Sequence, residues 1–332
     1  MDRIKKDGYS AAAAVFFLAA VLILMSMYLP IVAVAAVFVL AYAVAMWGPV
    51  GIVITVLSFA AGCLLDVKLT AFLAASFIPT ALAAGLTVKK QLRMRSGIQI
   101  TAGAALIGLS AALVVLWLFT GLGPIDYIVS RFGIFLGTLG DGSVKLLYQS
   151  VRLIDLLTGA VSQSALYAAS ASEAIVFMQD TLREALNYFL VGGMLCFTLL
   201  MGLLGFVITR AFVKKKRSVV AIASFDTWSL PPKFWLAYLL SYLFAVAGVS
   251  ADWPSFEVVA QTIADVYGFV LTVQALSLLD YFYKKKKMAT AVRVLLHVVI
   301  TLFLGFVLVW VGLFENMASL RKRMDTQGGT VL

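Results

Sequence analysis

The chain has 332 residues, of which 63% are hydrophobic and 13% are charged, and its formal net charge is +10. Soluble globular proteins have roughly 45–50% apolar and about 25% charged residues, so a single soluble core cannot hide this much apolar surface. The composition therefore excludes a soluble fold and indicates a protein that lipid covers. The positive charge points to the cytoplasmic face of a membrane and to anionic lipid, and not to nucleic acid as a partner.

Continuous apolar runs of about 20 residues predict helices that cross the hydrocarbon of a bilayer, which is about 30 Å thick. A membrane barrel would instead show strands of about ten residues in which polar and apolar side chains alternate. We therefore predict an all-α, polytopic transmembrane helical bundle of about eight to nine spans. In chain order the predicted spans are 11–28, 31–47, 50–65, 69–88, 98–119, 188–213, 234–249, 258–283 and 292–314.

Lysine and arginine predict the orientation, because basic residues gather on the cytoplasmic side. With a cytoplasmic N-terminus in the cell membrane, most basic residues lie inside, including the clusters 89–95, 210–217 and 284–287. A count of nine crossings places Arg321 and Arg323 outside, against the rule. Either the C-terminus is outside, or the last predicted span bends back at its glycines, Gly305 and Gly312, without crossing.

The segment 121–187 differs from the rest, because it carries six acidic and four basic residues. Apolar residues repeat at spacings of three and four between Val144 and Ile154, which predicts an amphipathic helix with a stop near Gly159. A second helix is expected from about Ala165 into the sixth span. We expect an extracytoplasmic amphipathic helical segment that lies on the membrane or caps the bundle; a plain connection is the alternative. The predicted regions are thus a five-span region (1–120), this segment (121–187) and a three- to four-span region (188–332).

Residue types that carry catalysis or bind metals do not cluster along the chain. The single histidine, His297, lies in an apolar run and is expected to be packed or hydrogen-bonded, and Cys63 and Cys196 stand alone. The sequence has no zinc-protease, serine-hydrolase or phosphate-loop motif. We therefore expect no enzyme activity, no metal and no cofactor.

Polar side chains at membrane depth are costly and are therefore candidates for function. The span 258–283 contains Asp265, Gln274 and Ser277, and Gln274 and Ser277 share a helix face because they lie three residues apart. These three residues predict either a ligand-binding pocket or ion path, or hydrogen bonds that fix helix packing. Near the end of the same span, Asp280 precedes Lys284 by four residues and predicts an ion pair along the helix.

The stretch before the span 234–249 is the most distinctive cytoplasmic segment. Phe225 and Trp228 suit a membrane interface, Asp226 suits a turn, and Pro231 ends any preceding helix. These four residues predict either an interfacial anchor or a binding element for a cytoplasmic partner. Alanines in the first span, such as Ala11 and Ala19, predict close helix packing within the chain or docking to another membrane subunit.

A Phe-x-x-Trp-x-Leu-Pro element resembles the signature of the YybS-like family of bacterial polytopic membrane proteins. Two shorter patterns agree, although one has Ala where the family pattern has Gly and the other has Glu where it has Asp. The early spans are also distantly similar to the substrate-binding subunits of energy-coupling-factor transporters. The resemblance implies a membrane protein that captures or transports a small molecule. Its elements are Phe225, Trp228, Leu230 and Pro231, then Gln274-Ala275-Leu276, then Gly312-Leu313-Phe314-Glu315 with Arg321, and the turn Trp47-Gly48-Pro49.

Two functions follow from these observations. The first is a subunit that captures or transports a small-molecule ligand, which requires a cavity among the spans. The second is a non-catalytic scaffold or regulator, which engages partners through Phe225–Lys233 and the small-residue faces and needs no pocket.

Overall fold

The computed structural model describes residues 2–26, 31–157, 170–216, 224–250, 253–321 and 323. These residues form helices and no β-strand, in two compact units. The first unit comprises Met1–Leu190 and Met201–Lys216, and the second comprises Val191–Leu200 and Arg217–Leu332. In the described part of the chain, five helices are long and apolar enough to cross a membrane, and four shorter apolar helices accompany them. Each of these helices overlaps one predicted span, which confirms the all-α, multi-pass fold.

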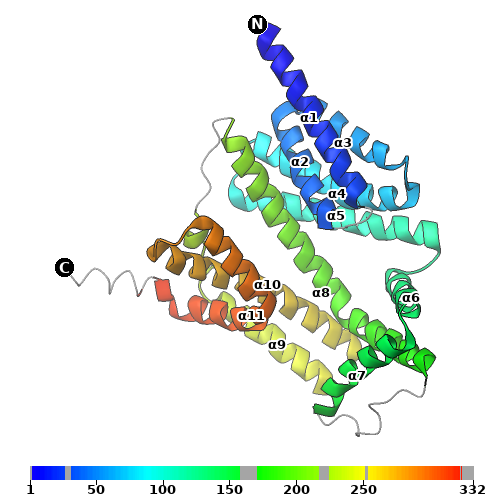
Figure 1. Ribbon diagram of the computed structural model, residues 1–332. Helices are drawn as coiled ribbons and strands as arrows, with labels where there is room; N and C mark the ends of the chain where they lie inside the picture. The colour runs from blue at the N-terminus through cyan, green and yellow to red at the C-terminus, as the bar shows by residue number, and fades with distance from the viewer. Residues whose placement is uncertain are drawn as a thin grey trace. The chain divides into compact units, whose positions relative to one another are not determined.

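The first unit is built around the second helix of the chain. Val37, Leu40 and Ala41 of this helix are fully buried, and Figure 1 shows its neighbours gathered about it in blue to cyan. Of the alanines predicted to pack closely, Ala19 is buried in this core whereas Ala11 is exposed. The helices are α1 (Asp2–Ser26), α2 (Ile31–Trp47), α3 (Pro49–Gly62), α4 (Val67–Lys89) and α5 (Met94–Thr120).

Glycine allows these helices to approach closely. A Cβ atom added at Gly85 would lie 2.6 Å from the carbonyl oxygen of Ala41, and one added at Gly108 would lie 2.5 Å from that of Ser76. Such distances leave no room for a side chain. Small residues in these spans therefore serve helix packing within the chain.

The segment 121–187 contributes a smaller core to the first unit. It consists of α6 (Pro124–Gly137), α7 (Asp141–Leu157) and the beginning of α8 (Ala171–Lys214). Helix α7 confirms the predicted amphipathic helix, and α8 runs without a break into the sixth predicted span, as expected. Helix α6 was not predicted as a separate element, and Gly159 and Ala165 lie outside the described residues. The buried residues of this core are Leu136, Val144, Tyr148, Ala174 and Met178.

The second unit contains a short 3-10 turn and three helices, together with the Val191–Leu200 part of α8. Helices α9 and α10 run antiparallel, because the ring of Phe234 lies 5.0 Å from that of Tyr267 while the ring of Phe244 lies 6.2 Å from that of Phe256. The elements are η2 (Phe225–Thr227), α9 (Phe234–Ser250), α10 (Pro254–Lys285) and α11 (Thr290–Ala318).

Helix α11 is broken at Leu304, whose backbone angles (φ −127°, ψ 25°) are not helical. Before the break the helix runs antiparallel to α10, because the Arg293 guanidinium lies 2.8 Å from the Asp280 carboxylate and the Nε2 atom of His297 lies 3.1 Å from the carbonyl oxygen of Leu276. The first half of α11 therefore leads away from the C-terminal end of α10.

After the break α11 runs parallel to α10. A Cβ atom at Gly268 would lie 3.9 Å from Val309, and one at Gly312 would lie 2.0 Å from the carbonyl oxygen of Leu271. The contacts thus move from residue 309 to residue 312 in α11 as they move from residue 268 to residue 271 in α10, which is the pattern of parallel helices. The second half of α11 therefore returns toward the end of α10 at which the first half began.

Distances to the loop 224–233 confirm the reversal. The ring of His297 lies 6.1 Å from that of Phe225, while Nη1 of Arg321 lies 2.7 Å from the carbonyl oxygen of Asp226. In a straight helix residues 297 and 321 would lie about 36 Å apart, too far to reach adjacent loop residues. Each half of α11 is about 21 Å long, less than the roughly 30 Å of bilayer hydrocarbon. Of the two alternatives for the C-terminus, the structure thus adopts the one in which the last predicted span bends back.

Candidate functional site: a polar pocket beside the loop 224–233

The loop 224–233 is held on α10 by the two polar residues that share a face of that helix. The side-chain oxygen of Gln274 accepts a hydrogen bond from the backbone N–H of Leu230 at 2.9 Å. The hydroxyl of Ser277 lies 2.7 Å from the carbonyl oxygen of Phe225 and 2.9 Å from that of Trp228. These bonds satisfy the N–H of Leu230 and the carbonyl oxygen of Trp228, and they add a second donor to the carbonyl oxygen of Phe225, which also accepts from the N–H of Trp228. Gln274 and Ser277 thus share a face of α10, as predicted, and this face positions the loop.

The second half of α11 fixes the other end of the loop through Asn316. Its side-chain oxygen accepts from the backbone N–H of Trp235 at 3.0 Å, and its nitrogen donates to the carbonyl oxygen of Pro231 at 3.0 Å. The N–H of Trp235 lies in the first turn of α9, where backbone donors lack helical partners. Asn316 therefore joins the start of α9 to the returning half of α11.

A buried ion pair completes this side of the site. The chain leaves α11 through Ser319, whose left-handed conformation (φ 48°) turns Arg321 back toward the helix. Nε of Arg321 then donates to Glu315 at 2.8 Å, and its Nη1 donates to the carbonyl oxygen of Asp226 at 2.7 Å and to the hydroxyl of Ser277 at 3.0 Å. Glu315 is 4% exposed and Arg321 is 9% exposed. One guanidinium thus joins α10, α11 and the loop.

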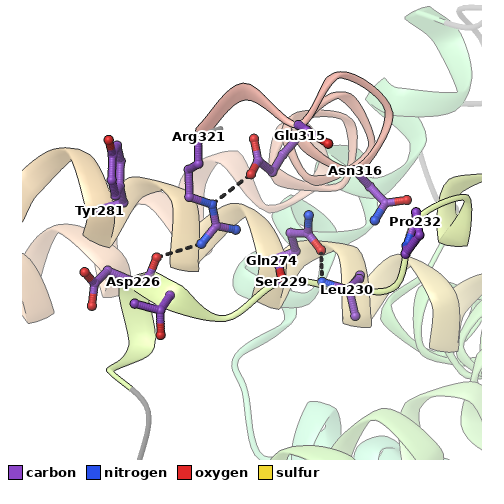
Figure 2. Close-up of a pocket in the computed structure, with 11 residues that line it drawn as sticks. Asp226, Ser229, Leu230, Pro232, Gln274, Tyr281, Glu315, Asn316 and Arg321 are labelled. Atoms are coloured by element: carbon purple, nitrogen blue, oxygen red, sulfur yellow. Dashed lines mark hydrogen bonds and ion pairs between the residues drawn. The ribbon is translucent and has the colours of Figure 1, made fainter. Parts of the chain in front are cut away.

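These elements enclose a pocket of about 330 Å³. Figure 2 shows Arg321 between Glu315 and Asp226, with Gln274 bonded to Leu230 below them. Two buried atoms of the ion pair, Oε2 of Glu315 and Nη2 of Arg321, have no hydrogen-bond partner among the described residues. Both residues line the pocket, although these two atoms are themselves buried. Its lining is Asp226, Thr227, Ser229, Leu230, Pro232, Gln274, Tyr281, Glu315, Asn316, Ser319 and Arg321.

Ion pairs tie the loop and the N-terminal end of α11 to the C-terminal end of α10. The ammonium of Lys284 donates to the Asp226 carboxylate and to the hydroxyl of Ser224. Burial raises the pKa of Asp226, but hydrogen bonds from Lys284 and Ser224 and the charge of Lys284 together hold that pKa below its usual value. Asp280 forms the predicted pair with Lys284 at 3.9 Å, but its shorter contact is with Arg293 at 2.8 Å.

The aromatic residues of the loop pack against each other and against α11. The rings of Phe225 and Trp228 are 5.0 Å apart, and Phe225 also lies beside His297. His297 is hydrogen-bonded to the carbonyl oxygen of Leu276. Phe225, Asp226 and Trp228 are partly buried, whereas Pro231 is exposed. All four predicted partner-binding residues therefore contact α10 or α11, and Pro231 does so through its carbonyl oxygen, which accepts from Asn316.

Asp265 lies elsewhere in the second unit. It lines a separate pocket of about 230 Å³ together with Gln261 of its own helix and Tyr238 of α9. Of the three predicted ligand-binding residues, Gln274 thus lines the first pocket and Asp265 lines the second, whereas Ser277 is bonded to the loop. Among the described residues, no group of three or more His, Cys, Asp or Glu side chains is placed to hold a metal ion.

Sequence reasoning missed Asn316 and did not identify the pairing of Glu315 with Arg321. The available signal was a Glu-Asn dipeptide at the end of an apolar run, followed by a basic residue. That signal is readable only when the last helix is known to return to the loop.

Comparison with known proteins places the chain in a membrane family. No curated protein and no solved structure matches it. One family model, described as a predicted membrane protein, matches residues 147–314, just over half of the chain. The matched residues include the loop 224–233, all of α9 and α10 and most of α11. The chain therefore belongs to the DUF2232 family of predicted membrane proteins.

Proposed function

We propose that this protein is a non-catalytic membrane subunit that captures or transports a small polar molecule, which binds in the pocket formed by the loop 224–233, α10 and α11. The observation that carries the proposal is the broken helix α11, whose returning half ends at this pocket. Helices that stop or reverse at membrane depth are tolerated where they are covered by protein or line a cavity, and transporters use them to build binding sites.

The chemistry of the pocket indicates the class of ligand. Glu315 and Arg321 present opposite charges, and Gln274 and Asn316 add amide groups. Because the lining carries both donors and acceptors, a ligand that both donates and accepts hydrogen bonds would be favoured here. A purely apolar ligand would leave these groups unsatisfied. The resemblance to substrate-binding subunits supports the same class of function.

The proposal includes an orientation in the cell membrane. The N-terminus and the basic clusters 89–95, 210–217 and 284–287 face the cytoplasm, and the segment 121–187 lies outside. The pocket then opens near the cytoplasmic surface, because Lys284 and Arg321 lie beside it.

The test is identification of small molecules that copurify with the protein in mild detergent. Native mass spectrometry should detect a bound polar molecule with the wild type and lose it with Gln274→Ala. The matched control is Gln179→Ala, which removes a glutamine of the first unit and should leave the bound molecule in place. Equal binding by all three proteins, or no bound molecule with any of them, would contradict the proposal.

A scaffold or regulatory role is the second candidate, and one observation favours it. The loop residues Pro231, Pro232 and Lys233 are exposed. Aromatic hot spots contribute about 2–4 kcal/mol to partner binding, so Trp228→Phe should weaken a partner complex roughly 30-fold or more if Trp228 recognises a partner. Copurification of partners at matched expression measures this. Equal recovery of every partner would leave the loop as an anchor only.

A further inference from the structure

We propose that Asp265 is a reversible proton-binding site within the membrane-spanning part of the second unit. Asp265 lies about 17 Å along α10 from its first residue, Pro254, and is therefore distant from the end of the helix. An ionised carboxylate at membrane depth is costly unless it is paired, and such residues mark ion or proton paths. The inference concerns a pocket other than that of the proposed function and does not depend on it.

Asp265 differs from the acidic residues around the first pocket. Asp226, Asp280 and Glu315 each pair with a lysine or arginine. In the described part of the second unit, no basic side chain forms an ion pair with Asp265. Its carboxylate accepts one hydrogen bond, from the amide of Gln261 at 2.7 Å. A neutral donor of this kind is compatible with either protonation state of the carboxyl group.

The pocket around Asp265 has both apolar and uncharged polar lining, and among its described lining residues Asp265 alone is an acid or a base of ordinary charge at pH 7. The hydroxyl-bearing side chains of the pocket are Tyr238 and Tyr242 of α9 and Thr272 of α10. Among the described residues, the titratable groups near Asp265 are the two tyrosines and, from α8, Cys196, whose Sγ lies 3.6 Å from the backbone oxygen of Asp265. Phenols and thiols are neutral at pH 7 unless perturbed. Helix α11 contributes only the apolar Val309 to this pocket.

The neighbouring helix leaves room for the carboxyl group. A Cβ atom at Gly192 of α8 would lie 2.6 Å from Oδ2 and 3.3 Å from Cβ of Asp265, so a larger residue there would displace the Asp265 side chain. The pocket of about 230 Å³ is large enough for water, since a single water needs roughly 10–15 Å³ of such volume. Protonation then transfers a proton from a hydronium ion in the pocket to a carboxylate oxygen and leaves a water molecule and a neutral acid. Release is the reverse step.

The experiment uses dicyclohexylcarbodiimide, a hydrophobic reagent that adds to protonated carboxyl groups in apolar surroundings. The full-length protein in sodium-free detergent buffer is labelled at pH values from about 5 to 9, and modified peptides are identified by mass spectrometry. The Asp265 peptide should be labelled, and labelling should fall about tenfold per pH unit above its midpoint, as the protonated fraction does. Asp280, paired with Arg293, is the internal control and should stay unlabelled.

Two variants keep the test falsifiable. Asp265→Asn should abolish labelling at this position, and Asp265→Glu should retain it, which shows that the pocket remains folded around a carboxyl group. Absence of labelling at every pH, or labelling that does not change with pH, would overturn the proposal. Protection by added sodium chloride at constant pH would overturn it as well, because the site would then bind a metal cation.

Discussion

At the scale of single residues, the Glu315–Arg321 pair decides how the C-terminal end of α11 is held. Burial of two charges is expensive, and their attraction offsets this cost only when the remaining polar atoms also find partners. Arg321 meets this condition in part, because it bonds Glu315, the backbone of Asp226 and the hydroxyl of Ser277. Loss of one partner therefore costs more than the pair itself contributes.

Arg321→Ala should destabilise the protein by about 3–5 kcal/mol, because Glu315 would be left as a buried charge without its partner. The thermal midpoint in detergent, followed by circular dichroism, measures the effect. Arg323→Ala is the matched control. Arg323 is exposed, and exposed ion pairs contribute roughly 0–1 kcal/mol. Equal midpoints for the two variants would show that the buried pair does not hold this region.

Asp226 should make stability depend on pH in the acidic range. Its pKa is lowered in the folded state, so the carboxylate stabilises the fold above its unfolded pKa of about 3.9, and this contribution is lost as pH falls through the folded pKa. Asp226→Asn lacks this contribution at every pH. The difference in thermal midpoint between wild type and variant should therefore be constant near neutral pH and shrink in acid. Parallel curves down to about pH 3 would contradict the assignment.

At the scale of elements, the break in α11 gives its two glycines different roles. Gly312 lies where the returning half crosses α10, and a Cβ atom there would lie 2.0 Å from the carbonyl oxygen of Leu271. Gly305 follows the break and has no atom within 4 Å of an added Cβ. Its neighbours Leu302 and Phe303 are 74% and 77% exposed, as expected for the tip of a hairpin.

Gly312→Ala should destabilise the protein by about 1–3 kcal/mol, because the methyl group forces α11 away from α10. Gly305→Ala should be close to neutral, since open space surrounds it. Thermal midpoints of the two variants in the same detergent make the comparison, and both replace glycine by alanine in the same helix. A larger loss for Gly305→Ala would show that α11 does not return along α10 as described.

Much of the fold could be predicted because a membrane helix is specified locally, by an apolar run of sufficient length. The face shared by Gln274 and Ser277 could also be predicted from local sequence, since helical spacing alone places them together. The reversal of α11, in contrast, could not be predicted from local sequence. Its apolar run is long enough to cross, and only Leu304, an ordinary residue in sequence, departs from helical geometry. The pairing of Arg321 with Glu315 depends on that reversal, so it remained out of reach.

At the scale of the whole molecule, the reversal of α11 removes the conflict between the basic C-terminus and the rule for positive charge. Arg321 bonds the same loop that Lys284 holds, so both belong to one end of α10. If the eight other predicted spans cross the membrane, the hairpin returns the C-terminus to the side of the N-terminus. We then expect the basic clusters 89–95, 210–217 and 284–287 and Arg321 to lie on one side of the membrane, as the rule for positive charge predicts.

This topology predicts how single cysteines respond to an impermeant thiol reagent in intact cells. In a background with Cys63→Ser and Cys196→Ser, Lys286→Cys and Arg323→Cys should both be protected and become reactive only after permeabilisation. Ser150→Cys, on an exposed position of α7, should react from outside and serves as the positive control. In a straight ninth span, residue 323 would lie on the outer side of the membrane, the same side as residue 150. Labelling of residue 323 but not of residue 286 in intact cells would therefore contradict the hairpin. The same topology would place Arg321 on the opposite side of the membrane from the loop 224–233, so the bond between Arg321 and Asp226 could not form.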